Sequence, residues 1–207
     1  MKDKHGTLRV TGTGDIKVAP DEAVVHLRVL TEGKTAAEAV VSAANQTDAV
    51  LKAVSAQPNH GVTTTGLGVN PIVTYDPKTN IPKIVGFRAS NGVQVRTKVG
   101  YAGQVFDAGV KAGANQSSGM SFRLQDETPF REDALRMAVK QACDEARLVA
   151  KATDIELEGP EAIEIDPRAE QRYFRTQALE AKSVATPVIP EDLTIAASVK
   201  IMFRTKG

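Results

Sequence analysis

Apolar and polar residues alternate along residues 83–97, KIVGFRASNGVQVRT. Val, Phe and Ala side chains occupy most alternate positions from Val85 to Val95, and Arg, Ser and Gln side chains lie between them. A period of two predicts a long strand with one buried face and one face in water. Gly86 and Gly92 interrupt the pattern, which indicates a bulge, a bend or a close backbone approach near each end of the strand.

Six further segments have the composition or the alternation of strands. They are residues 8–13, 18–30, 62–75, 118–124, 155–165 and 193–203. The first is predicted to end at the run Gly12-Thr13-Gly14-Asp15. The turn formers of residues 76–80, DPKTN, separate residues 62–75 from residues 83–97, so the two strands are predicted to form one long antiparallel hairpin.

Two helices are predicted in the first half of the chain. Residues 35–55 begin with the capping-box spacing of Thr35 and Glu38. Residues 101–112 form a shorter helix, and Gly113 is suited to end it in the left-handed conformation. The buried stripe expected on the first helix is Val40, Ala44, Thr47, Leu51 and Val54.

A third helix is predicted over residues 128–151. Thr128 would supply the capping hydroxyl, and Pro129 suits the first turn because it needs no amide donor there. The buried stripe expected on this helix consists of mostly small side chains: Leu135, Ala138, Ala142, Ala146 and Val149. Such a stripe allows close packing on a sheet.

The predicted order of elements is β-β-α-β-β-α-β-α-β-β. Hairpins and helices in this order predict the α+β class, with an antiparallel or mixed sheet and helices packed on one face. The arrangement strand–helix–strand–strand occurs twice, over residues 18–97 and 118–204, which suggests two βαββ units. Residues 1–207 are expected to form a single domain, with residues 1–7 as a leader and residues 167–191 as an extended surface loop.

Composition and charge exclude several classes of function. The chain has 207 residues, of which 42% are hydrophobic and 25% charged, and it has no Trp. These shares are those of a folded, soluble protein whose core is built from Val, Ile, Leu and Ala. The net charge of +1 gives no electrostatic footprint for nucleic acid, so no nucleic-acid partner is predicted.

The amino terminus bears on location. The sequence MKDKHGTLRV has charge but no apolar h-region, so it does not have the form of a signal peptide. It fits equally a native start and the start that remains after a leader has been removed. No apolar run approaches the roughly 18 residues of a transmembrane segment. A single cysteine, Cys143, fits both the periplasm and the cytoplasm.

The usual catalytic and cofactor motifs are missing from the sequence. Gly12-Thr13-Gly14 and Gly66-Leu67-Gly68 lack the third glycine and the following helix of a dinucleotide site. The histidines, His5, His26 and His60, lack metal-ligand spacing. Neither a catalytic residue nor a cofactor or metal site is therefore predicted. Cys143 is expected to pack beside the alanines of its helix, and a redox role helped by Lys140 and Arg147 is the alternative.

Charged residues near the end of the chain suggest a contact surface. Acidic residues follow one another along residues 154–166, and a basic, aromatic-containing loop follows them. This pattern is typical of a solvated strand face and a mobile loop, but the opposite charges could also bind ions or pair between subunits. The residues predicted to form the contact surface are Arg88, Arg96, Arg168, Arg172, Tyr173 and Arg175.

Segments along nearly the whole chain resemble one family. They are Val10 to Gly14 with Val18 to Asp21, Gly86 to Asn91 with Val93 to Val95, Gly113-Ala114 with Met120 to Phe122 and Leu124, the alanines at 134, 138, 142, 146 and 150, and Thr186 to Pro190. In this order they resemble SIMPL-domain proteins, also known as domain of unknown function 541, which include bacterial periplasmic immunogenic proteins. The chain departs from that pattern at Glu191, where many relatives have glycine, and in having no signal sequence.

The resemblance implies a periplasmic or otherwise extracytoplasmic location and a tendency to self-associate, with a cytoplasmic location as the alternative. It implies no catalytic residue, because the family has no established catalytic motif. The first hypothesis is accordingly a non-enzymatic cell-envelope protein, stress-related and assembled into a homo-oligomer through hairpin edges and the charged loop. The second is a module that binds a small ligand or peptide in a groove under residues 167–191. The third is an oxidative-stress protein that acts through Cys143.

Overall fold

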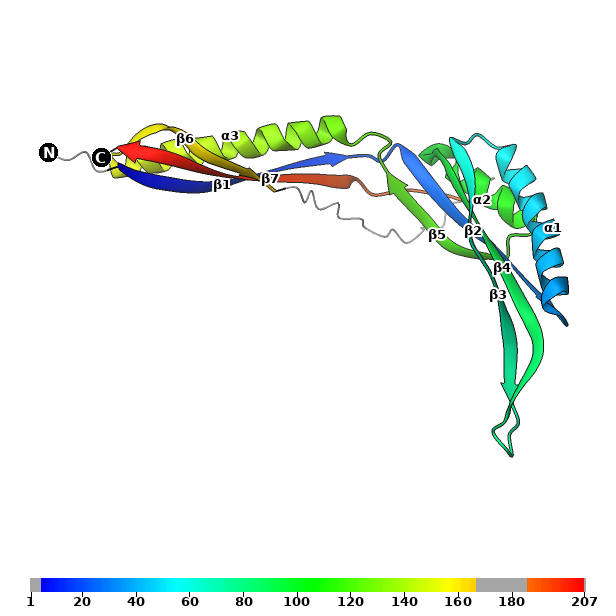
Figure 1. Ribbon diagram of the computed structural model, residues 1–207. Coiled ribbons are helices and arrows are strands. Elements are labelled where there is room, and N and C mark those ends of the chain that lie inside the picture. Colours follow the sequence, from blue (N-terminus) through cyan, green and yellow to red (C-terminus); the bar gives the residue numbers. More distant parts are fainter. Residues whose placement is uncertain (1–4, 167–185, 207) are drawn as a thin grey trace. The chain divides into compact units, whose positions relative to one another are not determined.

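The computed structural model describes residues 5–166 and 186–206, which form seven strands and three α-helices in the predicted order (Figure 1). The elements are β1 (His5–Val18), β2 (Glu22–Gly33), α1 (Ala36–Ser55), β3 (Gly61–Tyr75), β4 (Pro82–Lys98), α2 (Ala102–Lys111), β5 (Gln116–Arg123), α3 (Thr128–Thr153), β6 (Glu156–Ile165) and β7 (Leu193–Lys206). Two antiparallel sheets result, in the strand orders β1-β7-β6 and β3-β4-β2-β5. The α+β class is confirmed, and so is antiparallel pairing.

The contacts within the chain separate these elements into two units. The first unit contains β1, α3, β6 and β7. The second contains β2, α1, β3, β4, α2 and β5, together with residues 186–190. Since β1 precedes the second unit in sequence and α3 follows it, the second unit is an insertion between the first strand and the helix of the first unit. A single domain over residues 1–207 stays a prediction.

Both units contain the βαββ arrangement, with a correction to the predicted boundaries. In the second unit β2, α1, β3 and β4 follow one another, and the first strand pairs with the last. In the first unit β1 pairs with β7 in the same way, so β1 is the first strand of that repeat. Residues 118–124 were the predicted first strand, but β5 pairs with β2 instead. Met120 and Phe122 explain this position, because they pack against the core of the second unit.

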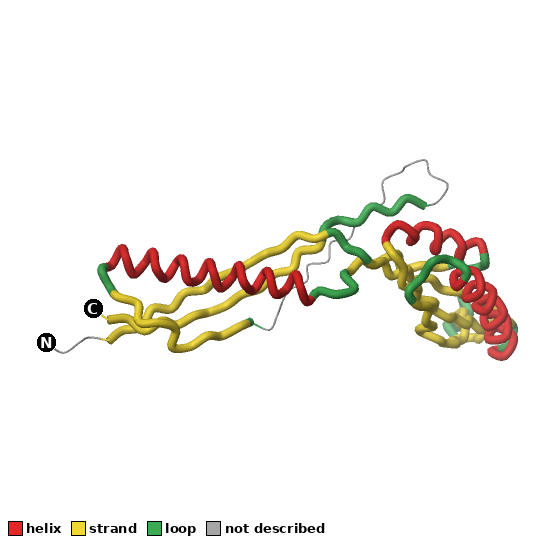
Figure 2. The backbone as a smooth tube through the Cα atoms, turned by 90° about the horizontal axis from the view of Figure 1, so that it is seen from above, coloured by secondary structure: helices red, strands yellow, loops and turns green. Residues whose placement is uncertain are grey.

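In the first unit α3 lies along the three-stranded sheet (Figure 2). Glycines of β1 let the helix approach the sheet closely. The alanines 134, 138, 142, 146 and 150 are buried along α3. A Cβ on Gly12 would clash with the carbonyl oxygen of Ala138, and one on Gly14 with that of Ala134. The prediction that the first strand ends at Gly12 to Asp15 is therefore wrong. The strand continues to Val18, since the glycines allow the helix to lie directly on the sheet.

Two details predicted for α3 are also corrected. The helix begins at Thr128, and the residue at the cap position is Glu127, so the Thr128 hydroxyl does not cap the helix. Instead, the Thr128 amide donates a hydrogen bond to the Asp126 carboxylate at 2.9 Å. Leu135 and Val149 are only partly buried, because the alanine stripe takes the face toward the sheet.

The second unit packs α1 and α2 on the four-stranded sheet. The predicted capping box is confirmed: the Thr35 hydroxyl accepts from the Glu38 amide at 3.2 Å, and the Glu38 carboxylate accepts from the Thr35 amide. Five residues of α1 are buried: Ala39, Ala43, Thr47, Val50 and Val54. The predicted stripe is thus wrong in part, since Val40 and Ala44 are exposed and Leu51 is only partly buried. Small alanines face the sheet because they pack closely against Ala89.

Candidate functional site

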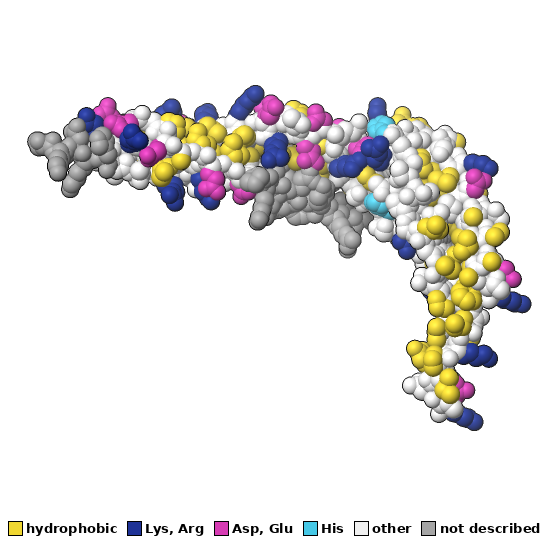
Figure 3. Space-filling model, viewed as in Figure 1, with side chains coloured by type: hydrophobic (Ala, Val, Ile, Leu, Met, Phe, Trp, Pro, Cys, Tyr) yellow, Lys and Arg dark blue, Asp and Glu magenta, His cyan; other side chains and the backbone are white. Residues whose placement is uncertain are grey.

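The hairpin of β3 and β4 exposes most of β3 and the first residues of β4. Both strands extend past α1, and no residue of β3 is fully buried (Figure 1). Hydrophobic side chains nevertheless gather along this arm (Figure 3). Their exposed fractions are 76% for Leu67, 44% for Val69, 42% for Val73, 60% for Tyr75, 62% for Ile81, 56% for Ile84 and 55% for Val85.

The hairpin register brings several of these side chains together. Val73 pairs with Ile84, and Tyr75 pairs with Pro82. Paired residues of an antiparallel ladder share one face of the ribbon, so an apolar strip follows the arm. The buried alternation predicted for residues 83–97 is confirmed at Ala89, Val93 and Val95 but is wrong at Val85, which lies beyond the helices and is 55% exposed.

The predicted contact residues Arg88 and Arg96 lie on the polar face of β4. The Arg88 guanidinium donates to Glu32 on β2, with Nη2 2.7 Å from Oε1. Arg96 Nη2 donates to the backbone carbonyl of His60 at 3.4 Å. The other four predicted contact residues, Arg168, Arg172, Tyr173 and Arg175, lie outside the described residues.

A buried carboxylate at the start of β2 organises a small charged cluster. Only 3% of the Glu22 side chain is exposed. Arg123 Nε lies 2.5 Å from Glu22 Oε2, and His60 Nδ1 lies 3.3 Å from Oε1. Burial alone would raise the pKa of Glu22, but hydrogen bonds from Arg123 and His60 hold the pKa below its ordinary value of 4.5. The cluster links the start of β2 to the end of β5 and to the residue before β3. Its members are far apart in the chain, so no local sequence signal points to it.

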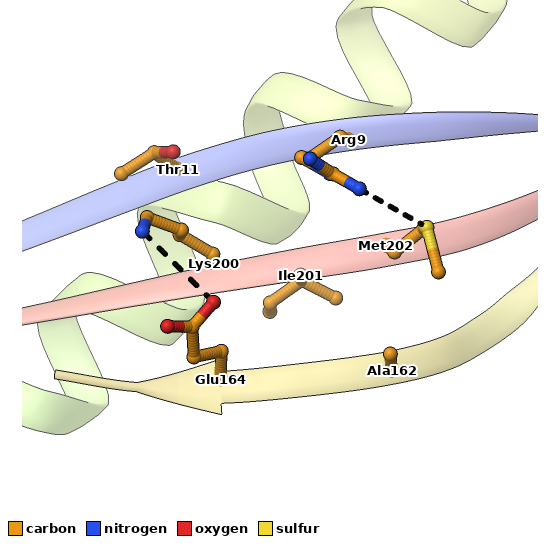
Figure 4. A pocket seen from close by; sticks show the side chains of 7 residues that line it. All are labelled: Arg9, Thr11, Ala162, Glu164, Lys200, Ile201 and Met202. Carbon is orange, nitrogen blue, oxygen red and sulfur yellow. Dashed lines mark hydrogen bonds and ion pairs between the residues drawn. The ribbon is translucent and has the colours of Figure 1, made fainter.

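The first unit carries a shallow groove on the face of its sheet away from α3 (Figure 4). Lys200 Nζ lies 3.9 Å from Glu164 Oε2, and Arg9 Nη2 lies 3.9 Å from Met202 Sδ. Within the fold, Lys200 therefore already pairs with a carboxylate, and Arg9 already contacts a sulfur atom. Two of the acidic residues predicted to bind ions are therefore paired with cations of β7: Glu164 with Lys200, and Glu161 with Arg204 at 3.3 Å.

The second unit contains an apolar cavity of about 230 Å³ next to the described end of the 167–191 segment. Its lining includes Phe106, Met120, Phe122, Val188 and Ile189. The neighbouring backbone is fixed by Asp107, whose carboxylate accepts from the Thr186 amide at 3.0 Å and from the Thr186 hydroxyl at 2.6 Å.

The remaining candidate residues lie apart from one another. His26 Nε2 is 3.4 Å from Ser121 Oγ on the polar face, and Cys143 is partly buried against the core of the first unit. Arg147, which could have acted on the thiol, pairs with Asp144 at 3.1 Å. In the part of the chain that the structure describes, His, Cys, Asp and Glu do not come together in threes around a possible metal position.

The family model described as SIMPL, protein of unknown function (DUF541), matches residues 8–203. The 26 kDa periplasmic immunogenic proteins of Brucella melitensis biotype 1 and of Brucella abortus strain S19 are each 26% identical over 223 residues. Each comparison covers all of this chain and 87% of the relative. Among the described helices, none combines the length and the apolar character required to cross a bilayer.

Proposed function

The chain belongs to the SIMPL family, and from that premise we propose that it is a non-enzymatic protein of the bacterial cell envelope that assembles with copies of itself. The relatives from Brucella are named as periplasmic, which supports an envelope location for this chain. The observation that carries the assembly is the apolar arm, which we define as residues 67–85 of the β3–β4 hairpin.

The arm has two properties of an assembly surface. It exposes seven large hydrophobic side chains between Leu67 and Val85, whereas hydrophobic residues on a monomer are more often scattered singly. In addition, β3 is an edge strand of its sheet, so one row of its backbone amides and carbonyls faces away from β4. Natural proteins commonly protect such an edge, and a second copy protects it by pairing with it.

Light scattering on the full chain across a range of concentrations tests this proposal. We expect a mass that is a multiple of the 22.0 kDa of one chain. The double substitution Val73→Lys and Ile84→Lys places charges on the strip and should shift the mass toward one chain, because buried charges oppose association.

The matched control is Leu148→Lys on α3, where a single leucine is 69% exposed. It should leave the mass unchanged. A strict monomer of the unaltered chain at high concentration, or an equal loss of mass in both variants, would contradict assembly through the arm.

The apolar cavity supports a second candidate function, the binding of a small apolar ligand or peptide side chain. Its aromatic and aliphatic lining, with few polar groups, is typical of such sites. Its volume of about 230 Å³ lies below the roughly 300–1,000 Å³ of drug-sized ligand pockets, so it fits only a small ligand or a single side chain. A thermal-shift series with short apolar peptides tests it. Stabilisation that disappears in Met120→Glu would support binding there, and the absence of stabilisation by every peptide would count against it.

A further inference from the structure

A groove lies on the polar face of the second unit's sheet, around the cross-strand row that contains Gly92. That row consists of Thr65, Gly92, Arg28 and Gln116, on β3, β4, β2 and β5. The next row consists of Thr63, Gln94, His26 and Gly119. All four residues of the first row, together with His26 of the second, line a groove of about 510 Å³.

The backbone around Gly92 and the bulge in β5 shape this groove. A Cβ on Gly92 would lie 2.6 Å from the carbonyl oxygen of Thr65, so no larger residue fits there. Gly119 has φ 92°, a conformation that other residues rarely adopt. The Ser117 hydroxyl donates to the His26 carbonyl at 2.5 Å and accepts from the Gly119 amide at 3.0 Å, which fixes the bulge in β5.

Arg28 gives the groove its charge. Its Nη2 lies 3.6 Å from the position that a Cβ on Gly66 would take, so the guanidinium reaches from β2 toward β3 across Gly92. Among the described residues the Arg28 side chain meets no carboxylate, and none lines the groove. The two glutamates of β2 are already engaged, Glu32 by Arg88 and Glu22 by Arg123.

We infer that this groove, which we call the Arg28 groove, binds a small organic ligand that carries an oxyanion, either a carboxylate or a phosphate. A guanidinium presents paired N–H donors that match the two oxygens of such a group. Thr65 and Gln116 also line the groove, and their side chains carry a hydroxyl and an amide, both hydrogen-bond donors. A groove of 510 Å³ exceeds the size of an inorganic ion and fits an organic molecule. This inference is independent of the assembly proposal.

Isothermal titration of the full chain with citrate and with inorganic phosphate, at low ionic strength, tests the inference. Citrate represents organic carboxylates, and phosphate represents the phosphate group alone. We expect saturable binding of at least one of them and a loss of affinity of about tenfold or more in Arg28→Gln, because a charged hydrogen-bond donor is removed. The Arg28 side chain is exposed, so the variant should keep the circular dichroism spectrum of the unaltered chain.

The matched control is Arg88→Gln, which removes an arginine from the same polar face but one that is paired with Glu32. It should change the affinity by less than about twofold, since its guanidinium is already engaged. Amide resonances provide a second readout: those of Gly92 and Ser117, which line the groove, should move during the titration. The absence of saturable binding of either ligand, equal losses in both variants, or movements confined to other residues would overturn the inference.

Discussion

At the scale of single residues, glycine and alanine explain how the first unit packs. Gly12 and Gly14 suggested a turn by composition, but they lie within β1 because α3 rests on them. Five alanines at every fourth position complete the contact from the helix. The sequence contained both halves of this interface, and only the fold brought them together.

The first prediction concerns Gly12. Replacing it with alanine should lower the free energy of unfolding by about 1–3 kcal/mol, because the new methyl group must displace the backbone of α3. Gly100→Ala is the control, since no atom lies within 4 Å of a Cβ at that position. Urea denaturation measures both changes. An equal effect in the two variants would mean that helix contact is not the cause.

The second prediction concerns Glu22 and pH. Its pKa is lowered in the folded state, so its contribution to stability is present above the ordinary value of 4.5 and is lost as the pH falls through the folded pKa. Glu22→Gln should therefore cost about 1–3 kcal/mol near neutral pH and reduce the loss of stability on acidification. Chemical denaturation at a series of pH values measures this.

Glu32→Gln is the control for Glu22, because its ion pair with Arg88 is exposed to water and contributes only about 0–1 kcal/mol. If both variants showed the same pH dependence as the unaltered chain, the buried cluster would not be the source of the effect.

At the scale of elements, local signals predicted the start of α1 better than its orientation. The capping box depends on residues three apart, so the chain itself specifies it. The buried face depends on which side chains meet the sheet, and several stripes of α1 are apolar enough to do so. Ala39 and Ala43 face Ala89 because their small size permits close approach, whereas Val40 is 41% exposed.

The third prediction concerns this cap. Thr35→Ala should lower the stability of the second unit by about 1 kcal/mol, because the Glu38 amide loses its acceptor. Thr35→Ser should restore most of the loss, since it keeps the hydroxyl. Thermal unfolding followed by circular dichroism compares the two. A serine variant as unstable as the alanine variant would indicate that the methyl group, and not the hydrogen bond, matters.

At the scale of the whole molecule, elements that are adjacent in sequence do not always belong to the same unit. The second unit contains its own core of β2, β4, α1 and α2 residues, and β1 belongs to the first unit although it comes before β2 in sequence. Whether each unit folds on its own can therefore be tested.

The fourth prediction is that a fragment of residues 20–123 folds. It should unfold cooperatively on heating but at a lower temperature than the full chain, because it lacks Val188, which packs against the core. The complementary fragment of residues 124–207 should not fold alone, since the alanines of α3 lose the glycines of β1. Circular dichroism compares the fragments; an unfolded spectrum for residues 20–123 would favour the single domain expected from the sequence.

The sequence by itself determined the α+β class, the order of the elements and the family. Alternation, helical stripes and capping residues act over a few neighbours, so they can be recognised without knowing the partners of each element. The sequence also indicated one long antiparallel hairpin through the turn formers between β3 and β4.

The tertiary structure alone decided which strands share a sheet and which polar residues meet. β5 joins β2 because Met120 and Phe122 fit the core of the second unit. Arg28 became a candidate for ligand binding only when the register placed it beside Gly92, without a carboxylate among the described residues that line the groove. Pairings of this kind join residues more than 60 positions apart, and a pattern along the chain does not specify them.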